Sequence, residues 1–355
     1  MLKTETAKVD LSLEIEVALA NFFKTHIEEA KEVGVSYERL WKELERLVRS
    51  GGKRTRPKIM LLTYRAFGGD NFKGAVSVAT ALELFHQFLL IHDDIIDRDF
   101  IRYGIPNIAG SYKEIYKDAI KDEGDRVHHA NSAAMLGGNL MLGSSHQLIN
   151  DADIDVKDKI KLNDILNRAH FEVGGGELLD VESAFQEASL AEALSIARYK
   201  TAGYSFITPV TIGATLAGAS QLDIDKLTEF AENLGKAFQL NDDLLGMFGD
   251  EVETGKSNST DLLEGKGTYL VASFFDNANE DEIKIFEKAF GKANATDEDI
   301  KAAKQLLIDS GAKKRTEETI NEFETVAMRA LDSLNLKQEF RDEYVKLVDK
   351  CMARK

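Results

Sequence analysis

The chain has 355 residues, of which 43% are hydrophobic, and a formal net charge of -16. That is ample apolar material for a sizeable core, but an acidic chain lacks the basic face that nucleic acid or an anionic membrane surface requires, so neither is expected as the main partner. The single cysteine, Cys351, excludes an intramolecular disulfide framework and is compatible with a reducing cytoplasm, where we expect the protein.

Apolar residues recur every three to four positions along nearly every long segment, which predicts helices. Ahead of residue 201 the predicted helices are Leu11 to Val33, Tyr37 to Val48, Ile59 to Phe67, Phe72 to Ile96, Ala130 to Ile149, Val156 to Val173 and Leu190 to Lys200. Beyond residue 222 they are Ile224 to Phe248, Thr268 to Phe275, Asp281 to Phe290, Asp297 to Leu307, Thr316 to Leu334 and Gln338 to Met352. Strand-type alternation of useful length is absent, so we expect one all-α domain over residues 1–355.

Two stretches are predicted to depart from a regular helix. Gly174 to Gly176 is expected to interrupt a helix, and it would admit a kink or a close backbone approach. Thr201 to Leu222 carries no charged residue and is long enough to span a bilayer. Because it is built of small residues with Pro209 in the middle, we interpret it as a tightly packed internal helix kinked there, and we expect no integral membrane protein.

An apolar helical run from Phe85 ends in Asp93, Asp94 and Asp97. Burying an unpaired carboxylate is costly, so three of them at the end of a hydrophobic segment call for a cation. At about 100° per residue, Asp93 and Asp97 share one helix face. An all-oxygen cluster suits Mg²⁺, which completes its coordination with water and phosphate. The alternative is a solvated acidic helix end, and recurrence of partner motifs decides between the two.

Such partners recur along the chain. Gly51 to Pro57 combines two glycines with three cations before a predicted helix, which makes a good anion site, with a solvated basic turn as the alternative when this stretch is considered alone. Phe238 to Gly246 again ends an apolar helix in adjacent aspartates, and glycine-flanked turns downstream carry Lys256 and Lys266. Two acidic helix ends and several basic islands, opposed across a cleft, would bind two diphosphates, one through metal ions and one directly.

These motifs, in this order from Gly51 to Lys266, resemble those of the trans-isoprenyl diphosphate synthases of the polyprenyl synthetase family. The resemblance implies a helical bundle of the isoprenoid synthase type with a central cavity, and a homodimer. It also implies a Mg²⁺-dependent head-to-tail condensation of isopentenyl diphosphate with an allylic diphosphate, with three Mg²⁺ ions. The implied product is a linear trans-prenyl diphosphate.

The resemblance also assigns roles to individual residues. Isopentenyl diphosphate would be bound by Lys53, Arg56 and His86. The metal ions would be held by Asp93, Asp94, Asp97 and Asp242. The allylic diphosphate and the carbocation formed from it would be contacted by Arg102, Lys200, Thr201 and Gln239. The phosphate ligands that close the site would be Lys256 and Lys266.

Product length is expected to depend on residues just before the first aspartate. The family resemblance puts the floor of the product tunnel at Phe88 and Leu89. One helical turn rises about 5.4 Å, close to one isoprene unit, so moving the floor by a turn changes the product by roughly one unit. Ideal helix geometry instead aligns Leu89, Phe85 and Leu82 beneath Asp93, and for the latter two core packing is the alternative. The pattern resembles geranylgeranyl-producing members, with farnesyl or longer products as alternatives.

Four positions depart from the family pattern. Tyr103 stands where a second arginine is usual, which predicts a weaker isopentenyl diphosphate site. Gly246 replaces the last aspartate of the second motif, leaving metal binding there to Asp242 and its neighbour. Glu177 replaces a common glutamine, and Asn139 replaces a common aspartate.

Two other functions compete with the synthase interpretation. A class I terpene cyclase would share the fold and the first aspartate motif, but its second motif fails here because Leu245 and Gly249 occupy its Ser and Glu positions. A non-catalytic synthase subunit would keep the motifs and lose the chemistry, as the departures allow.

Overall fold

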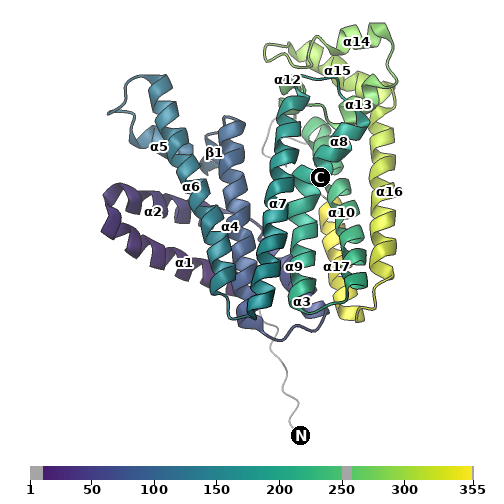
Figure 1. The fold of residues 1–355 in the computed structure, drawn as a ribbon. Helices are drawn as coiled ribbons and strands as arrows, with labels where there is room; N and C mark the ends of the chain where they lie inside the picture. The colour runs from purple at the N-terminus through teal and green to yellow at the C-terminus, as the bar shows by residue number, and fades with distance from the viewer. Residues whose placement is uncertain (1–10, 250–257, 354–355) are drawn as a thin grey trace. The chain divides into compact units, whose positions relative to one another are not determined.

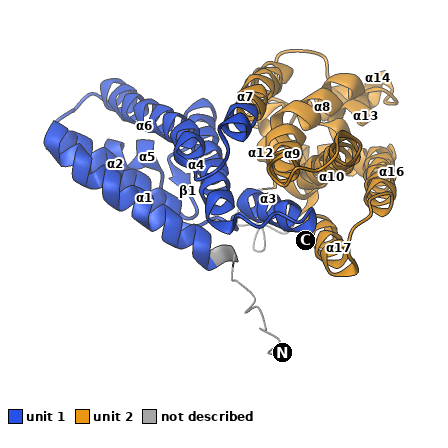
Figure 2. Ribbon diagram, turned by 60° about the horizontal axis from the view of Figure 1, so that its bottom comes forward, with its two compact units in different colours: residues 1–163 blue, residues 164–355 orange. Residues whose placement is uncertain are grey.

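The computed structural model describes residues 11–249 and 258–353 of the chain. It forms two compact units, residues 1–163 and residues 164–355, which are coloured separately in Figure 2 and described here one at a time. Both are helical, so the predicted all-α fold is confirmed (Figure 1). The expectation of one domain over the whole chain, and that of a central cavity, remain predictions.

Unit 1 consists of helices and one small hairpin. Its helices are α1 (Leu11–Val33), α2 (Val35–Ser50), α3 (Thr55–Ala66), α4 (Phe72–Ile96), α5 (Ile108–Ile115) and α6 (Glu123–Asp151). Strands β1 (Ile101–Arg102) and β2 (Ile105–Pro106) pair antiparallel between α4 and α5. This hairpin and α5 were not predicted, because two-residue strands and a single eight-residue helix leave too short a pattern to detect.

Helix α4 is the apolar centre of unit 1 and lies beside α6 (Figure 1). The side chain of Asn71 caps its start by accepting a hydrogen bond from the backbone N–H of Gly74, 3.1 Å away. Length and composition alone would let α4 cross a membrane, but 72% of its most apolar window is buried inside the protein. Packing against its neighbours therefore accounts for its composition.

Unit 2 begins within α7 (Val156–Ser183). It continues with α8 (Leu190–Ile196), the π-helix η1 (Ala197–Ile207), α9 (Thr208–Leu216), α10 (Gln221–Phe248), α12 (Thr260–Glu264), α13 (Tyr269–Phe275), α14 (Glu280–Phe286), α15 (Asp297–Asp309), α16 (Ala312–Asp332) and α17 (Gln338–Met352). Helix α10, which carries the second aspartate motif, packs against η1 and α16.

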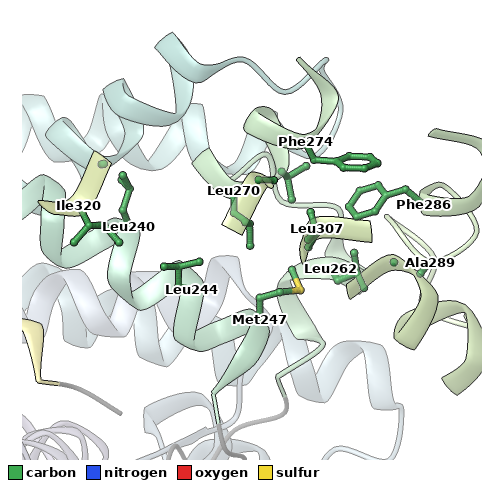
Figure 3. Packing of buried hydrophobic residues seen from close by; sticks show 14 of the residues in the cluster. Leu240, Leu244, Met247, Leu262, Leu270, Phe274, Phe286, Ala289, Leu307 and Ile320 are labelled. Carbon is green, nitrogen blue, oxygen red and sulfur yellow. The ribbon is translucent and has the colours of Figure 1, made fainter. Parts of the chain in front are cut away.

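One buried cluster holds the C-terminal half of α10 in place. Figure 3 shows Leu240, Leu244 and Met247 of α10 facing side chains from the helices that follow it. Within the same cluster the rings of Phe274 and Phe286 lie 4.6 Å apart. The last turns of α10 are therefore fixed by apolar packing, which orients the aspartates they carry.

The π-helix η1 lies against glycines of two neighbouring helices. A Cβ on Gly176 of α7 would lie 2.2 Å from the backbone nitrogen of Lys200, and one on Gly235 of α10 would lie 2.5 Å from the Cβ of Ala202. Only glycine permits these approaches.

Two sequence expectations are corrected here. Gly174 to Gly176 does not interrupt a helix, since α7 runs through it, although the predicted close approach is confirmed at Gly176. Pro209 does not kink a long α-helix: it stands in the first turn of α9, and the π-helix ends just before it. Proline has no N–H to donate, so its position at the start of α9 is the favourable one.

Because Lys200 N lies where a Cβ of residue 176 would stand, Gly176→Ala is expected to lower the free energy of unfolding by about 1–3 kcal/mol. The matched control is Gly175→Ala, since a Cβ there meets nothing within 4 Å. It should raise the free energy of unfolding by about 0.5–1 kcal/mol, because alanine favours a helix interior. Urea denaturation measures both, and equal values for the two variants would contradict the close approach.

Candidate active site

Helix α4 ends in a turn that directs the chain back toward its own aspartates. Asp99 donates its N–H to the carbonyl of Asp94 at 2.8 Å, and Arg98 donates to Ile95 at 3.3 Å. Arg98 adopts φ 58°, the left-handed conformation that this type of helix end requires. The reversal leads directly into strand β1, whose second residue is Arg102.

Arg102 pairs with two aspartates of the first motif. Its Nη2 lies 2.5 Å from Asp94 Oδ1 and 3.1 Å from Asp93 Oδ2, and its Nε donates to Asp94 Oδ1 at 2.8 Å. Arg102 thus contacts the carboxylates of the motif themselves, and its role toward the allylic diphosphate remains a prediction. Asp97 caps the helix and is exposed.

Asp94 is the buried member of the motif, with 2% of its surface exposed. Its Oδ2 is buried and has no hydrogen-bond partner among the described residues. Burial raises the pKa of Asp94 to about 6, against the opposing effect of the Arg102 guanidinium. A second cation at this carboxylate would supply the partner that Oδ2 lacks, which is what a metal ligand needs.

In the glycine-rich basic loop, Arg54 differs from its neighbours. Arg54 is 5% exposed and bonds to Glu83 at 2.9 Å and to Glu16 at 2.7 Å, so it is a structural cation. Lys53 is exposed and Arg56 is half-buried, so both are more accessible to an anion than Arg54. The sequence prediction assigned the diphosphate to the same two residues.

His86 lies on α4 among the same cations. Burial lowers the pKa of His86 well below its usual range, and the charges of Arg56, Arg102 and Arg54 lower it further. The imidazole is therefore neutral at pH 7, and a neutral ring can still donate one N–H to a diphosphate oxygen. Arg56 and Arg102 are thus close enough to His86 in unit 1 for their charges to affect its pKa.

In unit 2, η1 carries Lys200 and Thr201, and both contact polar side chains of α7 or α10. The ammonium group of Lys200 lies 2.5 Å from Asp180 and 3.1 Å from Glu177. The Thr201 hydroxyl donates to Gln239 Oε1, and Gln239 Nε2 donates to Asp243 Oδ1 at 2.8 Å. These bonds fix the orientation of the Gln239 amide on α10.

The second aspartate motif is more crowded with carboxylates than the sequence suggested. Burial raises the pKa of Asp243 well above its usual range, and the charges of Asp261, Asp242 and Asp180 raise it further. Asp242 itself is exposed at the surface of α10. Like charges held this close favour a bound cation.

Asp261 of α12 was missed by the sequence analysis. A Cβ on Gly246 would lie 2.7 Å from Asp261 Oδ2, so this carboxylate fills the side-chain space at the last position of the second motif. Its signal was present, since Asp261 is one of two acidic residues, with Glu264, between the two glycine-flanked lysine turns. Lys266 Nζ lies 3.8 Å from Asp261 Oδ1 and 3.4 Å from Glu264.

The other residues named from the sequence are Lys256 and those expected to determine product length. Lys256 lies outside the described residues. Phe88 is 5% exposed, and its ring meets the edge of His92 with centroids 4.8 Å apart. Leu89 is half-buried, while Phe85 is fully enclosed.

The carboxylates of each motif, taken separately, are of the kind that binds Mg²⁺ without a closed cage. Among the described residues no three His, Cys, Asp or Glu side chains form a ready-made metal cage. Mg²⁺ does not need one, because it binds through one or two carboxylates and takes its other ligands from water and phosphate. The unpartnered oxygen of Asp94 and the crowded aspartates of α10 are donors of this kind.

Two apolar helices of this all-α fold end in aspartates, and guanidinium or ammonium groups lie beside them or near them in the same unit. These features are typical of a protein that binds phosphorylated substrates with the help of metal ions. Comparison with known proteins specifies it further. The polyprenyl synthetase family model matches residues 38–307. The chain is 32% identical over 323 residues to a geranylgeranyl diphosphate synthase of Sulfolobus acidocaldarius, covering 89% of this chain and 91% of that protein.

Other relatives differ in product or have solved structures. A geranylfarnesyl diphosphate synthase of Aeropyrum pernix is 35% identical over 271 residues, covering 75% of this chain and 78% of that one. A Corynebacterium glutamicum geranylgeranyl pyrophosphate synthase, solved with isoprenyl diphosphate and magnesium, is 30% identical. It superposes with a TM-score of 0.89, covering 98% of this chain and 100% of that chain. The chain belongs to the polyprenyl synthetase family, and it is a trans-prenyl diphosphate synthase, a prenyltransferase.

The raised pKa of Asp94 has a consequence for stability in the metal-free protein. The folded state holds a proton on Asp94 between about pH 4 and pH 6 that the unfolded chain has released, so this group makes folding less favourable as the pH rises through that range. Asp94→Asn, which is neutral throughout, should therefore raise the free energy of unfolding by up to about 3 kcal/mol at pH 7 and have no effect below about pH 4.

Urea denaturation at several pH values measures this difference. Asp99→Asn is the matched control, because Asp99 is exposed and only five residues away. A lower stability of Asp94→Asn at pH 7 would contradict the cost of burying this carboxylate.

Proposed function

We propose that the protein condenses isopentenyl diphosphate with an allylic diphosphate, head to tail, in the presence of three Mg²⁺ ions. The observation that carries this is the first motif, where Arg102 forms ion pairs with Asp93 and Asp94 at the end of an apolar helix. His86 lies close enough to Arg56 and Arg102 for their charges to lower its pKa. The Corynebacterium glutamicum relative, solved with isoprenyl diphosphate and magnesium, supports the choice of ligands.

The proposed role of each residue follows from the charge of its side chain. Lys53 and Arg56 bind the isopentenyl diphosphate, and neutral His86 donates a hydrogen bond to it. Asp93, Asp94, Asp97 and Asp242 hold Mg²⁺, which neutralises the diphosphate that leaves the allylic substrate. When that anion arrives, Arg102 can exchange its contacts with the aspartates for contacts with phosphate oxygens, because bidentate pairing suits both.

The reaction itself needs no covalent bond to the protein. The allylic C–O bond breaks, the diphosphate leaves with the electron pair, and the double bond of isopentenyl diphosphate attacks the resulting cation. A proton is then lost to the departed diphosphate. Thr201 and Gln239 present oxygen atoms to the cation, and Lys200 faces the leaving group. Lys256 and Lys266 bind the phosphates and help to exclude water.

We infer geranylgeranyl diphosphate as the product. Phe88 is the large side chain buried just before the aspartates, and relatives of similar identity are geranylgeranyl or geranylfarnesyl diphosphate synthases. Farnesyl and longer products are the alternatives, and chain length is the property that the experiment must resolve.

Incubation of the purified protein with isopentenyl diphosphate, an allylic diphosphate and Mg²⁺, followed by chromatography, tests the proposed function. A longer linear diphosphate is expected, and it should disappear when a chelator removes the metal. A hydrocarbon product would instead indicate a terpene cyclase. Absence of any product would indicate a non-catalytic subunit.

Phe88→Ala is expected to lengthen the product by at least one isoprene unit, because it removes the buried ring from the proposed floor. The substitution should also destabilise the fold by about 3–5 kcal/mol. Phe274→Ala is the control, since Phe274 is a fully buried phenylalanine of unit 2 and should cost similar stability without altering the product. An unchanged product ladder from Phe88→Ala would exclude Phe88 as the floor.

We also propose that the protein is a homodimer in which a second copy covers the exposed apolar side chains of α6. Met135 is 50% exposed and Leu136 is 60% exposed there, so two adjacent apolar side chains on one helix are accessible to a second copy. Leu136→Asp should halve the mass measured by light scattering. Leu222→Asp, at a 64% exposed leucine of α10, is the control and should leave the mass unchanged. A monomeric native protein would contradict the proposal.

A further inference from the structure

Tyr103 occupies a backbone conformation that does not suit it. It forms the two-residue turn of the β1–β2 hairpin with Gly104, and both have positive φ, 56° and 75°. A turn with two such residues favours Asn, Asp or Gly, and a tyrosine there costs of order 1 kcal/mol or more. A compensating contact is therefore expected, and the ring provides one.

The ring of Tyr103 lies against the first glycine of the basic loop. A Cβ on Gly51 would stand 2.7 Å from Cγ of the ring and 3.0 Å from both Cδ atoms. The contact involves the rigid near end of the ring, so a side chain at residue 51 could not be accommodated by a small rotation. The hydroxyl reaches further along the loop, 3.7 Å from the position of a Cβ on Gly52.

The same glycines are also held by Arg54. Its Nη1 donates to the Gly51 carbonyl at 2.9 Å, and its Nη2 donates to the Val48 carbonyl at 2.7 Å. Nη1 also lies 2.8 Å from the position of a Cβ on Gly52. The buried ion pair with Glu83 fixes the guanidinium in turn. The flexible pair Gly51–Gly52 is thus restrained by one aromatic ring and one buried cation.

We propose that Tyr103 is a positioning residue for the isopentenyl diphosphate site: packed on Gly51, it orders the loop that presents Lys53 and leads into Arg56. This inference rests on the proposed function, which assigns those two cations to isopentenyl diphosphate. Tyr103 thereby contributes by packing at a position where an arginine would contribute by charge. The ring of Tyr103 fits there because Gly51 has no side chain.

Steady-state kinetics of Tyr103→Asn, Tyr103→Phe and Gly51→Ala test this role. Asparagine relieves the backbone strain but removes the ring, so the variant should fold at least as stably as the native protein while KM for isopentenyl diphosphate rises about tenfold. Phenylalanine keeps the ring and should stay within about twofold. Gly51→Ala should resemble Tyr103→Asn, with KM for the allylic substrate unchanged in all three. Gly143→Ala, whose Cβ meets nothing within 4 Å, is the control.

The double variant Gly51→Ala/Tyr103→Asn separates the contact from unrelated effects. Because either change removes the same contact, the double variant should raise KM for isopentenyl diphosphate no further than Tyr103→Asn alone. Additive effects, an equal rise in both KM values, or no effect of Tyr103→Asn would overturn the proposal. A loss in Tyr103→Phe as large as in Tyr103→Asn would also overturn it, since the hydroxyl would then act directly.

Calorimetric titration with isopentenyl diphosphate alone keeps this inference separate from the proposed function. If the native protein binds isopentenyl diphosphate but lengthens no allylic diphosphate, the proposed function fails, and the affinities of the same variants still decide the role of Tyr103. If the native protein makes product but the variants bind isopentenyl diphosphate as tightly as it does, only the inference about Tyr103 fails.

Discussion

The cost of holding carboxylates out of water is the constraint that both aspartate motifs share, one in each unit. Asp94 on α4 and Asp243 on α10 are each pushed toward their neutral forms by burial. Unit 1 offsets this with Arg102, while unit 2 uses the Gln239 amide and leaves neighbouring carboxylates in place. In both units apolar packing holds the aspartates in positions where burial of their charge destabilises the fold unless a cation is bound. The metal-free protein is therefore less stable than it would be without these carboxylates.

Much of this was predictable from the sequence, because the features are long or chemically distinctive. Apolar periodicity predicted α4 and α10 within a few residues, and the aspartates at their ends led to the prediction of metal binding there. Glycines joined to cations led to the prediction of an anion loop. The pairing of Lys200 with Glu177 and Asp180 could not be foreseen, since it depends on how α7 meets η1 through Gly176. Spacing along one segment carries no information on such contacts.

The positions that depart from the family pattern can be explained only from their contacts in the folded protein. Gly246 looked like a lost ligand, yet the Asp261 carboxylate occupies its side-chain space. Arg54 and Arg56 look equivalent in sequence, but one is buried against Glu83 and the other is half-buried among the cations that surround His86. Asn139 is exposed on α6, and nothing in the structure explains it. A residue type predicts what chemistry is available, and its partners decide whether that chemistry is used.

The π-helix sets the angular position of the residues it carries. Its i→i+5 hydrogen bonds use more residues per turn than an α-helix, so η1 holds Lys200 and Thr201 at angles that an α-helix of equal length would not reproduce. In α-helical geometry each residue rotates the chain by about 100°. Homologues that gain or lose one residue between Thr201 and Pro209 would turn the Thr201 hydroxyl away from Gln239 while keeping every side chain of the motif. A one-residue insertion or deletion in that segment would therefore change the site even where every side chain around it is kept.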